Sequence, residues 1–267
     1  MQFFTLLSYG RSGSTFLKKW LNNHPQIVCM GEKLSTGNRS ESLEEFISKQ
    51  ENRFHWRIFQ FIYQYPWFGM ILSLFFETTL KDYAYYLLSD EPSGSLKVKR
   101  GKTFSDFPIR GLKVMYNQLF LFWPIRKYLF REKIIHLLRR NVLAIYVSAL
   151  AGDRFDLYHS NEEIRLPAIR VPTWNLRLKL AGIRLKQRYF HHLLKKKDCL
   201  TIYYEDLFSE NQFEILHMIL DFLGGEKKNV PVPEMKKTGY SDIRDRISNF
   251  KAVENKLRGT GFDYCLD

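Results

Sequence analysis

The start of this sequence constrains its fold most, because an apolar segment leads directly into a glycine-containing turn and then into a helical pattern. Residues 3–8 (FFTLLS) predict a short strand that is buried on both faces. The run 9–15 (YGRSGST) follows, and from Phe16 onward apolar residues recur at helical spacing. A strand, a tight turn and a helix in this order are typical of the first unit of an α/β fold, with the turn at the carboxyl edge of the sheet.

The rest of the chain repeats this alternation of strands and helices. It predicts an α/β fold class with a three-layer parallel β-sheet flanked by helices, in a single domain that spans residues 1–267. Residues 40–108 interrupt the pattern as an aromatic-rich helical insertion. The further strands are expected at 27–30, 111–115, 133–138 and 199–204, and the helices at 118–130, 141–150, 173–197, 211–223, 241–247 and 249–257.

The turn contains the groups that a phosphate-like anion requires. Gly10 and Gly13 permit tight backbone geometry, so that successive N–H groups and the start of the following helix can point at one anion. Ser12, Ser14 and Thr15 add hydroxyl donors, and Arg11 adds a permanent cation that can bind two oxygens. A plain turn with helix caps is the alternative interpretation. A nucleoside triphosphatase loop is disfavoured, because its lysine and its spacing are both missing.

The strand, the run 10–15 (GRSGST) and the helix resemble the 5′-phosphosulfate loop of sulfotransferases that use 3′-phosphoadenosine 5′-phosphosulfate (PAPS). The family's second motif is an arginine at a strand end with a serine eight residues later, and Arg140 and Ser148 have that separation. Residues 203–207 (YYEDL) resemble a family segment in which the second tyrosine, here Tyr204, lies beside the nucleotide. This resemblance implies a P-loop nucleotide-binding-like sulfotransferase fold.

Weaker matches extend the resemblance to most of the chain outside residues 40–108. Phe16 stands where the family often has an aromatic residue near the adenine, and 256–261 (KLRGTG) resembles the segment that closes over the cofactor. The turn 23–25 (NHP) and the strand 111–115 resemble bacterial glycan sulfotransferases, such as the nodulation-factor, lipopolysaccharide and trehalose enzymes. The cofactor-binding residues that the resemblance implies are Arg11, Ser12, Gly13, Ser14, Thr15, Phe16, Arg140, Ser148, Tyr204, Arg258 and Gly259.

The resemblance implies in-line transfer of a sulfuryl group from PAPS to a hydroxyl of a carbohydrate or glycolipid acceptor. Arg11 stands where many relatives have a catalytic lysine, and we expect it to stabilise the leaving group by its charge. Glu32 is the first choice for the base, although a surface carboxylate would fit the same position. His24 is the next candidate, and a helix-ending cap explains it equally well. We expect no metal, because no cluster has ligand spacing.

The formal net charge of +13 favours a polyanionic partner: nucleic acid, an anionic membrane or a phosphate-rich cofactor. Two other function classes are therefore weighed, a basic nucleic-acid-binding α/β protein and a small-molecule kinase. No reader motif favours the first, and the missing lysine and magnesium signature count against the second. A member of the family that has lost its activity is a third alternative. We expect a glycan or glycolipid partner and no nucleic acid.

The sequence also bears on the compartment and on membrane contact. Three cysteines without a CxxC spacing favour a reduced, cytoplasmic protein, and no signal peptide is recognised at the start. Residues 58–76 have no charged side chain, but Pro66 interrupts them, which favours a broken buried helix pair over a membrane span. The aromatic stretch 54–86 could instead bind an acyl chain or a sugar, so peripheral contact with the inner face of a membrane stays open.

Overall fold

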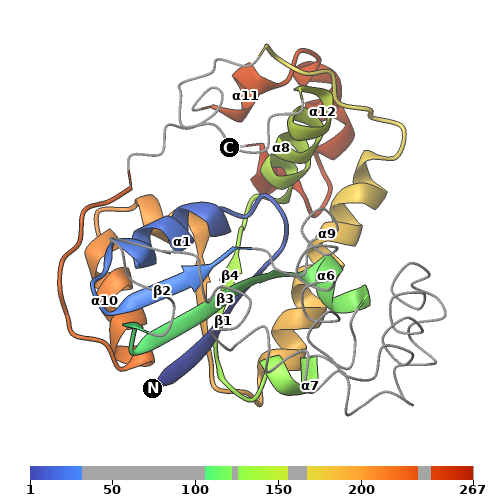
Figure 1. Ribbon diagram of the computed structural model, residues 1–267. Helices are drawn as coiled ribbons and strands as arrows, with labels where there is room; N and C mark the ends of the chain where they lie inside the picture. The colour runs from blue at the N-terminus through green and yellow to red at the C-terminus, as the bar shows by residue number, and fades with distance from the viewer. Residues whose placement is uncertain (32–105, 122–125, 156–166, 234–241, 267) are drawn as a thin grey trace.

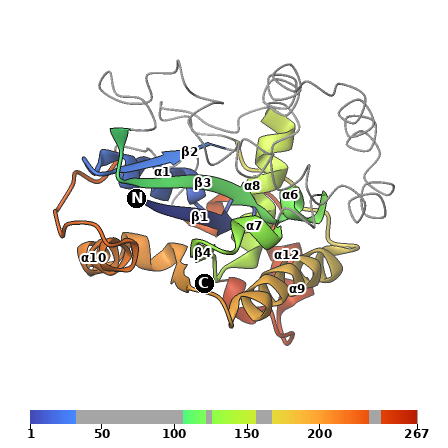
Figure 2. The same ribbon diagram turned by 60° about the horizontal axis from the view of Figure 1, so that its bottom comes forward.

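The computed structural model describes residues 1–31, 106–121, 126–155, 167–233 and 242–266. Its centre is a five-stranded sheet in which every pairing is parallel. The strand order is β2-β3-β1-β4-β5, and Figure 2 shows the first four strands following one another in this order. The strands are β1 (Gln2–Ser8), β2 (Ile27–Met30), β3 (Ile109–Met115), β4 (Lys133–Leu138) and β5 (Cys199–Tyr203). The parallel sheet confirms the predicted fold class.

Helices cover both faces of the sheet and give three layers. On one face, α1 (Ser14–Asn23) and α10 (Gln212–Leu223) bury residues such as Trp20 and Leu220 against the strands. On the other face, Phe190 of α9 (Leu176–Leu194) shares a core with α6 (Tyr116–Leu121) and α7 (Arg126–Leu129). Within the predicted helix at 118–130 the structure describes most of α6 and the whole of α7, and residues 122–125 between them lie outside the described part.

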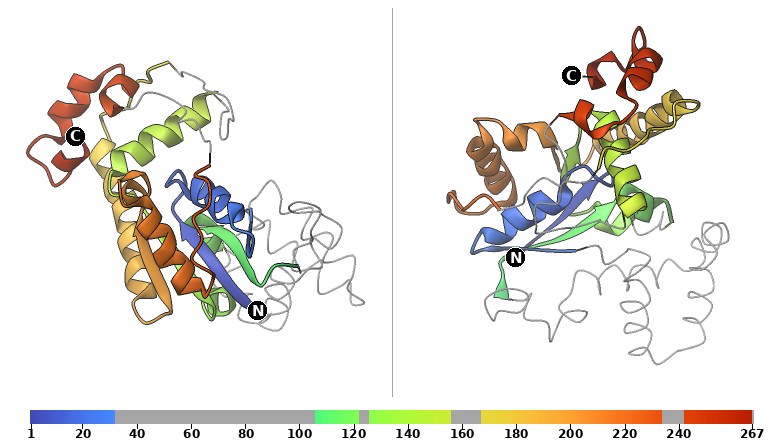
Figure 3. Two further views of the ribbon diagram at one scale, coloured as in Figure 1. Left: turned by 90° about the vertical axis from the view of Figure 1, so that its left-hand side faces the viewer. Right: turned by 90° about the horizontal axis from the view of Figure 1, so that it is seen from above.

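A third core lies beyond the carboxyl ends of the strands. It joins α8 (Val142–Phe155) and α9 to α11 (Ile243–Arg246), α12 (Phe250–Leu257) and the 3₁₀ helix η5 (Asp263–Cys265). Figures 1 and 3 show these C-terminal helices beside α8 and not on the sheet itself. The third core therefore lies next to the carboxyl ends of the strands, which is where ligands bind in this kind of sheet.

Strand β3 differs from the other strands because it places charged side chains inside the molecule. Arg110 and Lys113 are 7% and 4% exposed, although parallel strands of this kind are usually apolar throughout. Gly111 lies between them, and a Cβ at this position would approach the Phe4 ring of β1 to 2.2 Å. The strand therefore combines tight packing on β1 with two cations that need polar partners.

Three predictions concern residues outside the described part. The insertion at 40–108, the aromatic stretch 54–86 and the uncharged segment 58–76 lie there wholly or almost wholly. Among the residues that the structure describes, no helix is both long enough and apolar enough to cross a membrane. Cys29, Cys199 and Cys265 all have free thiols.

Candidate active site

The turn after β1 has the unusual backbone geometry that its sequence predicts. Gly13 has φ 87°, and Arg11 has φ 65°, the one left-handed non-glycine residue in the described part of the chain. A side chain in this conformation costs free energy, and such residues gather at functional sites. The helix α1 begins immediately afterwards at Ser14.

Gly13 is also required by the side chain that lies on it. A Cβ at Gly13 would lie 2.1 Å from Cδ2 of Tyr204, a distance at which the two atoms overlap. Tyr204 begins the 3₁₀ helix η4 (Tyr204–Phe208), which follows β5. The segment YYEDL and the glycine turn, nearly two hundred residues apart, are therefore in direct contact.

The hydroxyl groups of the turn have different surroundings. Ser12 is fully buried, and its Oγ has no hydrogen-bond partner within the described residues. A buried hydroxyl without a partner costs free energy, so this atom is suited to accept or donate a hydrogen bond to a ligand. The Thr15 Oγ1 accepts a hydrogen bond of 3.0 Å from the Nζ of Lys113, which brings the buried ammonium group of β3 to the start of α1.

Two arginines meet at the carboxyl edge of β1 and β4. The Nε of Arg11 donates to the Oγ of Ser148 in α8 at 3.0 Å, and Arg139 donates from its Nη1 to the carbonyl oxygen of Arg11 at 3.1 Å. The Arg139 guanidinium also lies 4.5 Å from the centre of the Tyr204 ring. Its Nε is buried and has no hydrogen-bond partner in the part of the chain that the structure describes.

A third arginine, Arg246 of α11, joins this group from the C-terminal region. Burial first, and then the positive charge of Arg139 and of Arg11, lower the pKa of the Arg246 guanidinium. Burial likewise lowers the pKa of Arg139. We call Arg11, Arg139 and Arg246 the inner arginines. Three cations that repel one another are stabilised by a bound anion with several charges.

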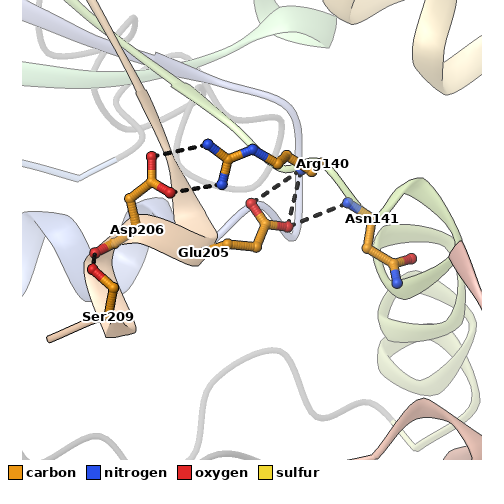
Figure 4. A network of polar contacts seen from close by, with 5 residues as sticks. All are labelled: Arg140, Asn141, Glu205, Asp206 and Ser209. Atoms are coloured by element: carbon orange, nitrogen blue, oxygen red, sulfur yellow. Dashed lines mark hydrogen bonds and ion pairs between the residues drawn. The ribbon is translucent and has the colours of Figure 1, made fainter. Parts of the chain in front are cut away.

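Arg140, the neighbour of Arg139, is held on the outside of the same edge (Figure 4). Its guanidinium makes two hydrogen bonds to the Asp206 carboxylate, of 2.6 and 3.1 Å, and this interaction raises the pKa of Arg140. The Glu205 carboxylate accepts hydrogen bonds from the backbone N–H groups of Arg140 and Asn141, at the start of α8. We call Arg140, Glu205 and Asp206 the outer corner.

The structure therefore brings together some predicted residues and separates others. Arg11, Ser148, Gly13 and Tyr204 converge with Ser12 and Thr15 around the turn. Arg140 contacts Asp206, whereas the hydroxyl of Ser148 accepts from Arg11.

Phe16, Arg258 and Gly259 have contacts outside the turn 10–15. Phe16 is 5% exposed and its ring centre lies 4.6 Å from that of Phe208, which is 42% exposed. Arg258, which follows the last residue of α12, pairs with Glu254 of that helix, and the N–H of Gly259 donates to Asp263. Ser14 is buried at the first position of α1.

The structure describes only one of the two candidate bases, His24. Glu32 lies outside the described residues. His24 is fully buried, and its Nδ1 accepts from the N–H of Gln26, so its Nε2 carries the proton and donates to the Glu226 carbonyl at 3.1 Å. This arrangement is that of a helix-ending cap.

His136 lies inside β4, as the sequence indicated. Its Nε2 is hydrogen-bonded to the hydroxyl of Tyr116. Burial, and then the charge of His191, lower the pKa of His136 to about 3, so the imidazole is neutral near neutral pH.

Four residues of the site have no place in the sequence prediction: Lys113, Arg139, Arg246 and Phe208. A lysine inside an otherwise apolar strand was a usable signal, because a buried ammonium group needs a polar partner. Arg139 was adjacent to the residue that the motif spacing selected. Phe208 follows the YYEDL segment directly, and Arg246 lies before the 256–261 segment, so both are outside the recognised motifs.

The described residues contain no group of three or more His, Cys, Asp or Glu side chains that could hold a metal ion. The polar groups around the turn are instead guanidinium, ammonium, hydroxyl and backbone N–H groups. This donor set fits phosphate or sulfate oxygens.

The chain was compared with a family model, with curated proteins and with solved structures. Residues 4–228 match the family model described as "Sulfotransferase family". A search of curated proteins found no match. Among solved structures, mouse sulfotransferase SULT7A1 complexed with PAP (adenosine 3′,5′-bisphosphate) is 15% identical, with a TM-score of 0.46, over 99% of this chain and 87% of that chain. A sulfotransferase from Alicyclobacillus acidocaldarius is 14% identical, with a TM-score of 0.43, over 96% of this chain and 94% of that one.

Proposed function

The chain belongs to the sulfotransferase family and is a sulfotransferase enzyme, and we propose that it transfers the sulfuryl group of PAPS to a hydroxyl of a carbohydrate or glycolipid acceptor. The observation that carries this proposal is the convergence of the inner arginines on a turn in which the Ser12 hydroxyl and the Arg139 Nε lack partners among the described residues. These groups fit a donor that has phosphate and sulfate at one end and a second phosphate at the other.

The 5′-phosphosulfate of PAPS would bind at the turn 10–15. The backbone N–H groups there lie at the start of α1, whose N-terminal end favours negative charge. The Ser12 hydroxyl, the Arg11 guanidinium and the Lys113 ammonium would supply donors to its oxygens. The Arg139 side chain stabilises the turn by its hydrogen bond to the Arg11 carbonyl oxygen.

The 3′-phosphate would bind between the helix α8 and the end of β4. Ser148 and Arg140 are the residues that the family motif assigns to this phosphate, and Arg246 adds a further cation close by. For Arg140 to contribute, its guanidinium must exchange the Asp206 carboxylate for the phosphate. The exchange replaces one anionic partner by another, so its free-energy cost is modest.

Aromatic side chains next to the turn offer a surface for the adenine. Phe208 and Tyr204 have ring centres 4.9 Å apart, and Phe208 lies over the buried ring of Phe16. Phe208 is partly exposed, so one of its faces or edges is accessible to a base. The buried ring of Phe16 would then pack against Phe208 and hold it in place, without contacting the adenine itself.

In the reaction, PAPS supplies a sulfuryl group whose bond to the bridging phosphate oxygen breaks as a bond to the acceptor oxygen forms. Arg11 and Lys113 would stabilise the negative charge that grows on the bridging oxygen. Glu32, which follows β2 after one residue, would take the proton of the acceptor hydroxyl. No residue in this scheme needs a metal ion.

The wider organisation is proposed on the same basis. Residues 1–267 would form one sulfotransferase domain, with residues 40–108 as an insertion that contacts the acceptor. The three free thiols favour a reducing compartment such as the cytoplasm.

Calorimetric titration with PAP, ADP and AMP tests the donor. We expect the wild type to bind PAP more tightly than ADP and AMP, and Arg140→Ala to lose this preference. Turnover of labelled PAPS on a panel of glycans and glycolipids then identifies the acceptor. Equal binding of all three nucleotides, or magnesium-dependent turnover of ATP in place of PAPS, would contradict the proposal.

A further inference from the structure

The helix α9 has apolar side chains on two opposite faces. One face is buried, with Leu180 and Phe190 both fully buried in the cores described above. On the other face, Leu178 is 77% exposed and Leu185 is 68% exposed. These two leucines are seven residues apart and so lie on the same side of the helix, two turns from each other.

Trp174 adds an exposed indole next to the start of this helix. It lies two residues before α9 begins, and 82% of its surface is exposed. Exposed leucine or tryptophan side chains are common singly, but an apolar stripe along one helix indicates an interaction surface. We call Trp174, Leu178 and Leu185 the α9 outer face.

Basic side chains flank the α9 outer face on both sides. Lys179 and Lys186 lie on one flank by helical geometry, and Arg177 and Arg188 lie on the other. All four are exposed, and no Asp or Glu occurs anywhere from residue 167 to residue 197. The surface is therefore apolar along its middle and positive along both edges.

We infer that the α9 outer face binds the surface of an anionic lipid membrane. Aliphatic and indole side chains can enter the boundary between headgroups and acyl chains, while lysine and arginine extend along the helix to the phosphate groups. A tryptophan at one end is typical of this interfacial position. A nucleic acid would use the positive edges but would leave the leucines in water, since aliphatic groups do not stack on bases.

The position of α9 relates this surface to the active site. Figure 2 shows α9 along the outside of the molecule. On its inner side the Nε2 of Gln187 donates to the carbonyl oxygen of Arg139. On the flank, the Nζ of Lys186 lies 5.9 Å from the Tyr9 ring centre. One helix, about 10 Å thick, thus separates the inner arginines from the proposed membrane surface. If the proposed function holds, this geometry favours an acceptor attached to lipid.

Vesicle co-sedimentation tests membrane binding without any nucleotide or acceptor. The wild type is compared on phosphatidylcholine vesicles and on vesicles with about one third phosphatidylglycerol. We expect binding to the anionic vesicles only, with a decrease at raised salt. The double variant Leu178→Ser/Leu185→Ser should bind at least about tenfold more weakly, because the apolar contribution is lost. Met218→Ser on α10, at a residue that is 40% exposed, is the matched control and should bind like the wild type.

Two further measurements separate this inference from its competitors. The emission of Trp174, obtained as the difference between wild type and Trp174→Phe, should shift to shorter wavelength on anionic vesicles. Unchanged melting temperature and PAP affinity in the double variant would show that the fold and the donor site are intact. Equal vesicle binding by the double variant, or no binding by the wild type, would overturn the inference. A change from dimer to monomer in the double variant without any vesicle binding would also overturn it, in favour of a second copy of the chain.

Discussion

Arg139 and Arg140 are adjacent in the chain but lie in opposite electrostatic surroundings. Arg139 stacks on Tyr204, donates to the Arg11 carbonyl and has a pKa that burial lowers. Arg140 stacks on Tyr203, pairs with Asp206 and has a pKa that this pairing raises. The inner arginines therefore crowd positive charges together, whereas the outer corner balances its charge within the protein. Burial thus lowers the pKa of Arg139, and burial together with the nearby positive charges lowers that of Arg246. A bound anion would favour the charged forms of both, whereas Arg140 already has an anionic partner in Asp206.

The largest expected effect comes from Gly13→Ala, which disturbs the turn under the inner arginines. The new Cβ would overlap with the Tyr204 ring, and the left-handed backbone adds about 1–2 kcal/mol of strain. We expect PAP binding to fall more than about 100-fold, with a lower melting temperature. Calorimetry and thermal unfolding measure the two effects.

Gly224→Ala is the matched control for this change. Gly224 has φ 74°, and no atom lies within 4 Å of the point that an alanine Cβ would occupy there, so only the backbone strain applies. A similar loss of PAP binding in both variants would show that stability, and not contact between Tyr204 and the turn, determines binding.

The next effect compares the two adjacent arginines directly. Arg139→Gln removes a charge-assisted hydrogen bond to the turn, and we expect PAP, ADP and AMP all to bind about 10- to 100-fold more weakly. Arg140→Gln should weaken PAP but leave ADP and AMP nearly unchanged. Titration of the three nucleotides into both variants would contradict the division into inner and outer arginines if the two patterns were the same.

A smaller effect is expected at Glu205, which serves structure within the outer corner. Its carboxylate accepts from the backbone N–H groups of Arg140 and Asn141, which begin α8. Glu205→Ala should lower the free energy of unfolding by about 1–2 kcal/mol, measured by urea denaturation. A normal stability together with lost PAP binding would instead assign Glu205 to the ligand.

The smallest effect is expected from Asp206→Asn, and the informative result is whether PAP binding becomes tighter or weaker. The pair with Arg140 is exposed to solvent and contributes about 0–1 kcal/mol to stability. Releasing Arg140 should tighten PAP binding a few-fold, since the 3′-phosphate no longer competes with the carboxylate. Weaker PAP binding in this variant would show that Arg140 does not move to the phosphate.

Most of the sheet could be predicted from sequence, since its strands are short, largely apolar runs and the turn after β1 contains two glycines. The apolar run of β1 and the termination of α10 at Gly224, which has a left-handed φ, follow from local chemistry alone. The arginine assignment was harder, because successive residues at a strand end point to opposite sides. Spacing selected Arg140, and only the three-dimensional arrangement shows that Arg139 contacts the turn.

Other parts of the site depend on contacts between distant segments. Arg246 reaches the inner arginines because Ile247 next to it pairs with Ile169 and its helix packs in the third core. No local sequence pattern predicts that Arg246 lies beside Arg11 and Arg139. Lys113 is the opposite case, since a lysine within an apolar strand already demands a partner.

The central place of β1 in the sheet has a consequence for how the protein is made. Both neighbours of β1 are parallel strands, β3 and β4, and the first pairing joins Gln2 to Ile109. During synthesis at about 5–20 residues per second, β1 therefore waits roughly 5–20 s before β3 has been made. For that time an apolar segment has no strand to pair with, and parallel pairing over such separations is slow. The strand that leads into the glycine turn of the site is thus exposed to chaperones and to aggregation while the chain is still growing.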